Sequence, residues 1–158
     1  RKIMKYFAIS DIHSFYSIAK EALDRAGFDP SNENHTLVVC GDIFDRGDET
    51  KEIYEYIKSL PRKILIRGNH ESLLEEMVER GYPLDHDIHN GTAKTVCDLN
   101  DIDFYDYYLG LADGDIEFPA KTKKTVELTK WIDENFVDYA EFTKYIAVHS
   151  WIPTRIRV

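Results

Sequence analysis

The sequence has little cysteine, glycine and proline, and it contains no long apolar run. Two cysteines, Cys40 and Cys97, are too few for a disulfide framework, which favours a reducing cytoplasm. Eight glycines and five prolines exclude a collagen-like or low-complexity chain. No apolar run approaches the roughly 18 residues that span a bilayer. With 43% hydrophobic residues, the chain is predicted to form a single soluble domain over residues 1–158.

Basic residues are also scarce, because 20 lysines and arginines stand against 29 aspartates and glutamates, a formal net charge of -9. The stretch over residues 98–117 holds seven aspartates and glutamates and has no lysine or arginine. Nonspecific binding to nucleic acid or to a membrane surface needs a basic stripe. We therefore expect neither nucleic acid nor membrane as a partner, and the sequence does not indicate an oligomeric state.

Four short runs rich in aliphatic and β-branched residues predict strands over residues 6–10, 36–40, 63–67 and 145–148. Each of the first three is followed by apolar residues at helical spacing, and each helical pattern stops at a glycine or a proline. Another helix is expected over about residues 123–136. Strands that alternate with helices predict an α/β fold with largely parallel pairing.

The segment over residues 81–120 is rich in acids and aromatic rings and predicts a helical acidic insertion. The simplest interpretation of residues 98–118 is a surface insertion packed by its own rings. A sharper hypothesis is a lid over the site that repels polyanions and selects a substrate. His86 and His89 lie in this segment without a scaffold around them, so we expect a solvated loop there rather than a second metal cluster.

Polar residues follow each predicted strand at the point where the strand ends. Their side chains carry carboxylate, imidazole, amide and guanidinium groups. In chain order they are Asp11, His13, Asp42, Asp45, Arg46, Asn69, His70, Glu71 and His149. The carboxyl ends of parallel strands share one edge of a sheet, so these side chains should converge there. Taken singly, each fits a helix or turn cap, but the whole set at strand ends is strong evidence for a site.

The donor types at this edge indicate a metal centre. Carboxylate, imidazole and amide groups without a thiolate suit Mn, Fe, Zn or Mg rather than a soft metal. A carboxylate at Asp42, at the end of the central strand, has two oxygens and can bridge two ions about 3.5–4 Å apart. The residues therefore predict a hydrolytic site that binds two metal ions.

The motifs Asp11-x-His13, Gly41-Asp42-x-x-Asp45-Arg46-Gly47, Gly68-Asn69-His70-Glu71 and Val148-His149 together resemble those of the calcineurin-like metallophosphoesterases. The Asp-Arg-Gly and Gly-Asn-His-Glu forms are similar to the phosphoprotein phosphatase branch, which includes bacterial and bacteriophage members and the diadenosine tetraphosphate hydrolases. The resemblance covers nearly the whole chain. It implies an α-β-β-α sandwich.

The resemblance also implies a ligand set. Asp11, His13 and Asp42 would hold the first metal ion, and Asp42, Asn69 and His149 would hold the second. The expected cofactor is two divalent ions, Mn²⁺ first, with Fe, Zn or Mg as alternatives.

Roles in the reaction are implied in the same way. His70 would be the general acid that protonates the leaving oxygen, Asp45 would orient it, and Arg46 and Asn69 would bind the phosphate. The implied activity is hydrolysis of phosphoric monoesters by hydroxide attack on phosphorus, on a serine/threonine phosphoprotein or a small phosphoester. Alternatives are a dinucleoside polyphosphate hydrolase and a non-catalytic metal- or phosphate-binding module. The acidic surface disfavours a nuclease.

Some positions depart from the family pattern. Ser14 and Ser150 stand where the family usually has glycine, and we expect the serine hydroxyls to lie near the metals and tune the site. A further histidine ligand and a later substrate-binding arginine have no counterpart before Val158. We therefore expect a domain that lacks the C-terminal part of its second sheet. Arg67 and Glu71 are expected to pair with each other or with neighbours.

Overall fold

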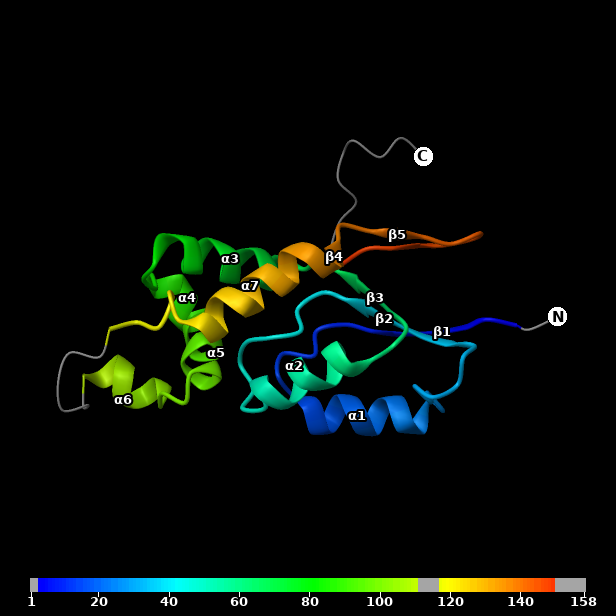
Figure 1. Ribbon diagram of the computed structural model, residues 1–158, viewed down its shortest axis with the longest axis horizontal. Coiled ribbons are helices and arrows are strands. Elements are labelled where there is room, and N and C mark those ends of the chain that lie inside the picture. The colour runs from blue at the N-terminus through cyan, green and yellow to red at the C-terminus, as the bar shows by residue number, and fades with distance from the viewer. Residues whose placement is uncertain (1–2, 111–116, 150–158) are drawn as a thin grey trace.

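The computed structural model describes residues 3–110 and 117–149, and the chain is mixed α/β (Figure 1). A 4-stranded sheet contains, in spatial order, β1 (Lys5–Ile9), β2 (His35–Cys40), β3 (Lys63–Ile66) and β4 (Phe136–Val137). All neighbouring strands in it are parallel. The predicted α/β fold with parallel pairing is thereby confirmed, and the first three predicted strands agree with β1, β2 and β3 to within one residue at each end.

Helices pack against one face of this sheet. They are α1 (Tyr16–Arg25), α2 (Thr50–Ser59), α3 (Asn69–Arg80) and α7 (Lys123–Asn135). Successive side chains of a strand point to opposite faces, and Phe7, Leu37 and Val39 share the face that joins the main hydrophobic core with these helices. Val38 and Ile66 are buried on the other face, outside that core cluster. The helix-covered face is thus the one on which most of the apolar surface is buried.

Residues 81–120 contain the helices α4 (Asp85–Asn90), α5 (Thr92–Leu99) and α6 (Phe104–Leu109). His86 and His89 are exposed on α4, so the prediction of a loop at these residues is wrong. The Asp87 carboxylate accepts the Leu84 backbone N–H at 2.7 Å and ion-pairs with Arg80. A carboxylate that caps the first turn in this way stabilises even a short helix.

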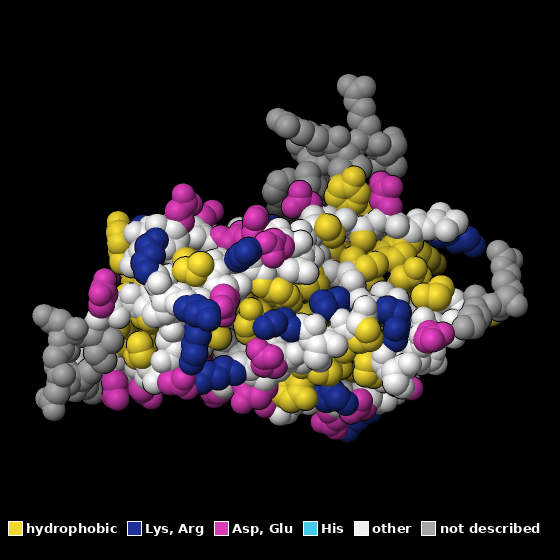
Figure 2. All heavy atoms as spheres, viewed as in Figure 1, with side chains coloured by type: hydrophobic (Ala, Val, Ile, Leu, Met, Phe, Trp, Pro, Cys, Tyr) yellow, Lys and Arg dark blue, Asp and Glu magenta, His cyan; other side chains and the backbone are white. Residues whose placement is uncertain are grey.

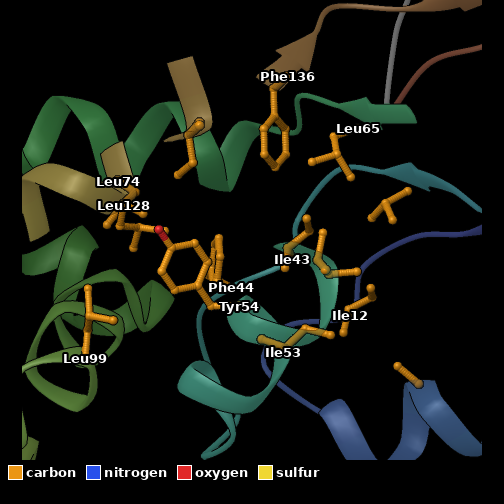
Figure 3. Packing of buried hydrophobic residues seen from close by; sticks show 14 of the residues in the cluster. Ile12, Ile43, Phe44, Ile53, Tyr54, Leu65, Leu74, Leu99, Leu128 and Phe136 are labelled. Carbon is orange, nitrogen blue, oxygen red and sulfur yellow. The ribbon is translucent and has the colours of Figure 1, made fainter. Parts of the chain in front are cut away.

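The core is continuous from the sheet to α5 and α7 (Figure 3). Tyr54 of α2 is part of this core, with its ring edge-to-face with Phe44 at 6.1 Å and with Trp131 at 5.1 Å between centroids. Leu99 and Leu128 lie on the α5 and α7 side of this ring in Figure 3. The same packing that stabilises the sheet therefore fixes α5 in place.

The fourth parallel strand is not the one predicted. Residues 145–148 were expected to join the sheet, but β6 (Ile146–Ala147) instead pairs antiparallel with β5 (Ala140–Glu141) in a separate hairpin. The fourth position belongs to β4, whose Phe136 and Val137 pair with Leu65 and Ile66. Two residues that directly follow a helix are too few to show a strand period, so the pattern could not reveal β4.

An apolar groove of about 810 Å³ lies between the hairpin and the face of the sheet away from the helices. Tyr6, Val38 and Ile146 are among its lining residues, and the Tyr6 ring meets Phe142 edge-on at 4.8 Å. Figure 2 shows hydrophobic side chains gathered beside this hairpin. None of the candidate site residues lines the groove. In the described part of the chain, no helix has the length and apolarity that crossing a membrane requires.

Candidate active site

The loops after β1 and β2 hold the candidate residues in a backbone conformation that side chains rarely adopt. The φ angles of Asp11, His13, Asp42, Asp45 and Arg46 are 51°, 47°, 56°, 77° and 69°. A left-handed conformation costs roughly 1–2 kcal/mol at a residue other than glycine, and such residues concentrate at functional sites. Hydrogen bonds between the loops hold this geometry, because Asp11 N–H donates to the Gly41 carbonyl at 3.2 Å and His13 N–H to the Asp42 carbonyl at 3.0 Å.

Two glycines allow the strand-end loops to approach each other. A Cβ on Gly68 would lie 2.2 Å from Asp42 Oδ1, and a Cβ on Gly41 would lie 2.5 Å from His149 Nδ1. Neither position has room for a side chain. The glycines of the Gly-Asp and Gly-Asn-His motifs are therefore needed for the close approach of backbone to ligand side chains.

Glu71 links the loop that follows β2 to the loop that follows β3. It is 1% exposed, and its carboxylate accepts the backbone N–H groups of Asp42 at 2.9 Å, Ile43 at 2.8 Å and Gly68 at 2.8 Å. Burial raises the pKa of Glu71, and the three N–H donors offset part of that rise. Glu71 therefore holds the backbone of Asp42 in register with the start of α3.

Of the two expected kinds of pairing, Arg67 forms an ion pair with a neighbour, Glu75, whereas Glu71 binds the three backbone N–H groups. A signal for the true role was present in the sequence. Glu71 lies three residues after Gly68, in the first turn of α3, and a glutamate at that position reaches back to the N–H of the residue that caps the helix.

His13 turns one ring nitrogen toward two carboxylates. Its Nδ1 donates to the Phe44 carbonyl at 2.9 Å, so the Nε2 atom carries a lone pair. That Nε2 lies 4.0 Å from Asp11 Oδ1 and 3.9 Å from Asp42 Oδ2. A ring whose far nitrogen is fixed by a carbonyl, and whose near nitrogen faces carboxylates, has the usual orientation of a metal-ligating histidine.

His149 has the same orientation on the other side of Asp42. Its Nδ1 donates to the Cys40 carbonyl at 2.7 Å, which leaves the Nε2 lone pair directed at the site. Nε2 lies 3.2 Å from Asp42 Oδ2 and 3.2 Å from Asn69 Oδ1. These three atoms converge, and together they are ligands of the kind that a divalent cation binds.

The ligand atoms of Asp11, Asp42 and His149 lie within 4.8 Å of one another, and so do those of His13, Asp42 and His70. Asp42 belongs to both groups, as a bridging carboxylate would. The candidate residues therefore fit a site for divalent metal ions.

His70 and Asp45 form a buried pair beside these ligands. His70 Nδ1 lies 2.6 Å from Asp45 Oδ2, and the His70 backbone N–H donates to Asp42 Oδ1 at 3.0 Å. The hydrogen bond to Asp45 raises the pKa of His70, although burial opposes the rise. The His70 ring meets the His13 ring edge-on with centroids 4.8 Å apart. The pair therefore places a histidine Nε2 next to the metal-ligand group.

The Arg46 guanidinium contacts the rings of both His13 and His70. Its Nη1 contacts His13 Nε2 at 3.2 Å and its Nη2 contacts His70 Nε2 at 3.4 Å. Arg46 is exposed, whereas Asp45 is buried. A planar guanidinium in this position can present two parallel N–H groups to an oxyanion.

The structure brings all the candidate metal-binding, catalytic and phosphate-binding residues to one edge of the sheet. His149 reaches this edge from the end of the β5–β6 hairpin and not from a parallel strand. The Ser14 hydroxyl was expected near the metals. Instead it is buried and hydrogen-bonds with Thr50 Oγ1 of α2 at 3.1 Å. Ser150 lies outside the described residues. Cys40, at the end of β2, is partly exposed.

The family model described as calcineurin-like phosphoesterase matches residues 4–157. The chain belongs to the calcineurin-like phosphoesterase family. Membership agrees with the resemblance of the strand-end motifs, and the cluster around Asp42 provides ligands for the divalent metals that this family uses.

Relatives of this phosphoesterase include proteins named symmetrical bis(5'-nucleosyl)-tetraphosphatase. The one from Xanthomonas axonopodis pv. citri is 33% identical over 69 residues, which are 43% of this chain and 21% of that relative. Those from Aeromonas salmonicida and Aromatoleum aromaticum are 34% and 33% identical over 77 and 79 residues, about half of this chain and 28% of each relative. The matched segments thus cover less than a third of each relative.

Proposed function

We propose that the protein hydrolyses phosphoric monoesters with two divalent metal ions, and that serine/threonine phosphoproteins are a substrate class. One observation carries the proposal. The Asp42 carboxylate lies between the Nε2 atoms of His13 and His149, and the His70–Asp45 pair and Arg46 lie directly beside it. The ligands, a proton donor and an anion-binding group thus occupy one edge of the sheet.

Asp11, His13 and Asp42 would hold one ion, and Asp42, Asn69 and His149 would hold the other. When bound, two such ions draw charge from the phosphoryl oxygens and make a water molecule nucleophilic at neutral pH. Oxygen and imidazole ligands without a thiolate suit Mn²⁺, with Fe, Zn or Mg as alternatives.

His70 would act as the general acid. Its Nδ1 is hydrogen-bonded to Asp45, so the proton available for transfer in the protonated ring would be the one on Nε2, the atom that Arg46 approaches at 3.4 Å. The raised pKa of His70 increases the fraction that carries this proton at neutral pH. Nε2 would pass the proton to the leaving oxygen as its bond to phosphorus breaks.

Arg46 would bind the phosphate. Its two terminal nitrogens already lie 3.2 Å and 3.4 Å from the two Nε2 atoms, so an oxyanion bound there would contact the guanidinium and face His70. Asn69, exposed at the start of α3, would contribute its amide group to the same phosphate.

A second candidate is symmetrical cleavage of a dinucleoside tetraphosphate, which the names of the relatives favour. The same residues would serve, with a nucleoside diphosphate as the leaving group. Diadenosine tetraphosphate separates the candidates, because symmetrical cleavage yields ADP alone. Rates on this substrate and on a phosphoserine peptide should be compared at equal enzyme concentration.

The first test is hydrolysis of p-nitrophenyl phosphate across a Mn²⁺ titration, with an Asp42→Asn variant prepared identically. We expect metal-dependent turnover that Asp42→Asn abolishes, and a loss of about 10²–10⁴-fold in His70→Asn with the fold unchanged. Phosphate binding without turnover at any metal concentration would contradict the proposal and favour a non-catalytic module.

A further inference from the structure

The Asp45 carboxylate has two partners that none of the strand-end motifs contains. Thr95 Oγ1 donates to Asp45 Oδ1 at 2.6 Å, and Thr92 Oγ1 donates to Asp45 Oδ2 at 2.8 Å. Oδ2 is also the atom that accepts from His70 Nδ1. The Asp45 backbone N–H donates to Thr95 Oγ1 at 3.0 Å, so Thr95 binds both the backbone and the side chain of Asp45.

These contacts are more than ordinary helix packing. A threonine hydroxyl on a helix normally bonds to a carbonyl one turn earlier, and the Thr95 hydroxyl is 3.4 Å from the Gly91 carbonyl but 2.6 Å from Asp45. Thr92 and Thr95 are 0% and 1% exposed, so water cannot replace them. The two hydroxyls and His70 Nδ1 all bind the buried carboxylate, which holds it in this orientation toward His70.

The start of α5 also contacts the next residue of the motif. Gly91, with φ 88°, approaches so closely that a Cβ there would lie 2.5 Å from the Arg46 backbone nitrogen. Asp45 and Arg46 are both in the left-handed conformation. The start of α5 therefore packs directly against two motif residues that hold a left-handed backbone conformation.

We propose that Thr92 and Thr95 are positioning residues for the general acid, and that α5 is part of the reaction apparatus. The two hydroxyls fix the Asp45 carboxylate, and the carboxylate fixes the His70 ring so that Nε2 faces the leaving oxygen. This inference rests on the proposed function, since it assigns His70 the proton transfer described there.

The first measurement needs no turnover. The full chain, loaded with diamagnetic Mg²⁺, is examined by NMR for the His70 Nδ1 proton, which is assigned by its disappearance in His70→Asn. Thr92→Val and Thr95→Val keep the shape and remove the hydroxyl, whereas Thr92→Ser and Thr95→Ser keep the hydroxyl. We expect the resonance to move or exchange away in the valine variants and to persist in the serine variants. An unchanged resonance in both valine variants would overturn the inference.

The second measurement uses two leaving groups with Mn²⁺. Phenyl phosphate needs a proton on its leaving oxygen far more than p-nitrophenyl phosphate does. We expect kcat for phenyl phosphate to fall about tenfold in Thr95→Val, with a smaller fall for p-nitrophenyl phosphate, an unchanged KM and recovery in Thr95→Ser. Equal losses on both substrates would mean a structural role only and would also overturn the inference. If the wild-type protein hydrolyses neither, the proposed function fails, and the NMR result alone decides whether the threonines position His70.

Discussion

The helices α5 and α6 follow one another in the chain, yet they relate to the rest of the molecule in different ways. Most of α5 is buried between α2, α3 and α7, and its hydroxyls reach Asp45. No residue of α6 is buried, and Tyr105 and Leu109 are 65% and 58% exposed. Neighbouring helices of one insertion can therefore belong to the core and to the periphery.

The side chains explain the difference. Small residues such as Ala93 let α5 approach its neighbours closely, and Val96 and Leu99 fill the space between the helices. On α6, Phe104 stacks on Tyr108 at 5.9 Å, and Phe104 and Tyr107 are only partly buried where they pack against the core. In the described part of the chain, no hydrogen bond, ion pair or ring contact joins α6 to a candidate metal ligand. The hypothesis that this region forms a lid stays a prediction.

The largest expected contrast comes from the last residues of the two helices, both leucines. Leu99→Ala should lower the free energy of unfolding by about 2–5 kcal/mol, because it leaves a cavity in the core. Leu109→Ala, at an exposed position, should change it by less than about 0.5 kcal/mol. Urea denaturation measures both. Equal losses in the two variants would show that α6 is packed as tightly as α5.

The glycines that follow α4 and α6 provide a second matched pair. Gly110→Ala should cost about 1–2 kcal/mol, because its φ is 62° but nothing lies within 4 Å of the added methyl group. Gly91→Ala should cost about 1–3 kcal/mol more, because its methyl group would collide with the Arg46 backbone. Turnover of p-nitrophenyl phosphate should fall in Gly91→Ala alone. Similar turnover in the two variants would contradict the proposed contact between α5 and the site.

The smallest effect is expected at Asp101, between the two helices, which accepts hydrogen bonds from Lys51 of α2 and from Lys124 of α7, the latter at 3.0 Å. These bonds lower the pKa of Asp101 from 3.8 to about 2. A depressed pKa means that its contribution to stability is complete above pH 3.8 and is lost as the pH falls toward 2.

Asp101→Asn should therefore lower the melting temperature slightly at pH 7 and by much less at pH 2, and asparagine tolerates the left-handed backbone there. Added salt should shrink the difference, since the carboxylate is exposed. Melting curves of the two proteins at pH 2, 4 and 7 test this pH dependence. A difference that grows toward low pH would refute it.

Sequence patterns succeeded where the information is local and failed where it is not. The hydrophobic runs that predicted β1, β2 and β3 lie within single elements, as does the helical period of α3 that stops at Gly81. β4 escaped notice because its two residues are recognised only by pairing with Leu65 and Ile66. The same limit applied to residues 145–148, whose composition suits a strand in either kind of sheet.

The amino-acid sequence by itself determined the chemistry of the site. Asp11, His13, Asp42 and His70 follow β1, β2 and β3 directly, and the carboxyl ends of parallel strands must share an edge, so their convergence follows from connectivity alone. Only the tertiary structure decided what fixes the Asp45 carboxylate beside His70, and it assigned that role to Thr92 and Thr95. The threonines contact Asp45 across 47 and 50 residues of chain, and no periodicity or local motif encodes a contact over that separation.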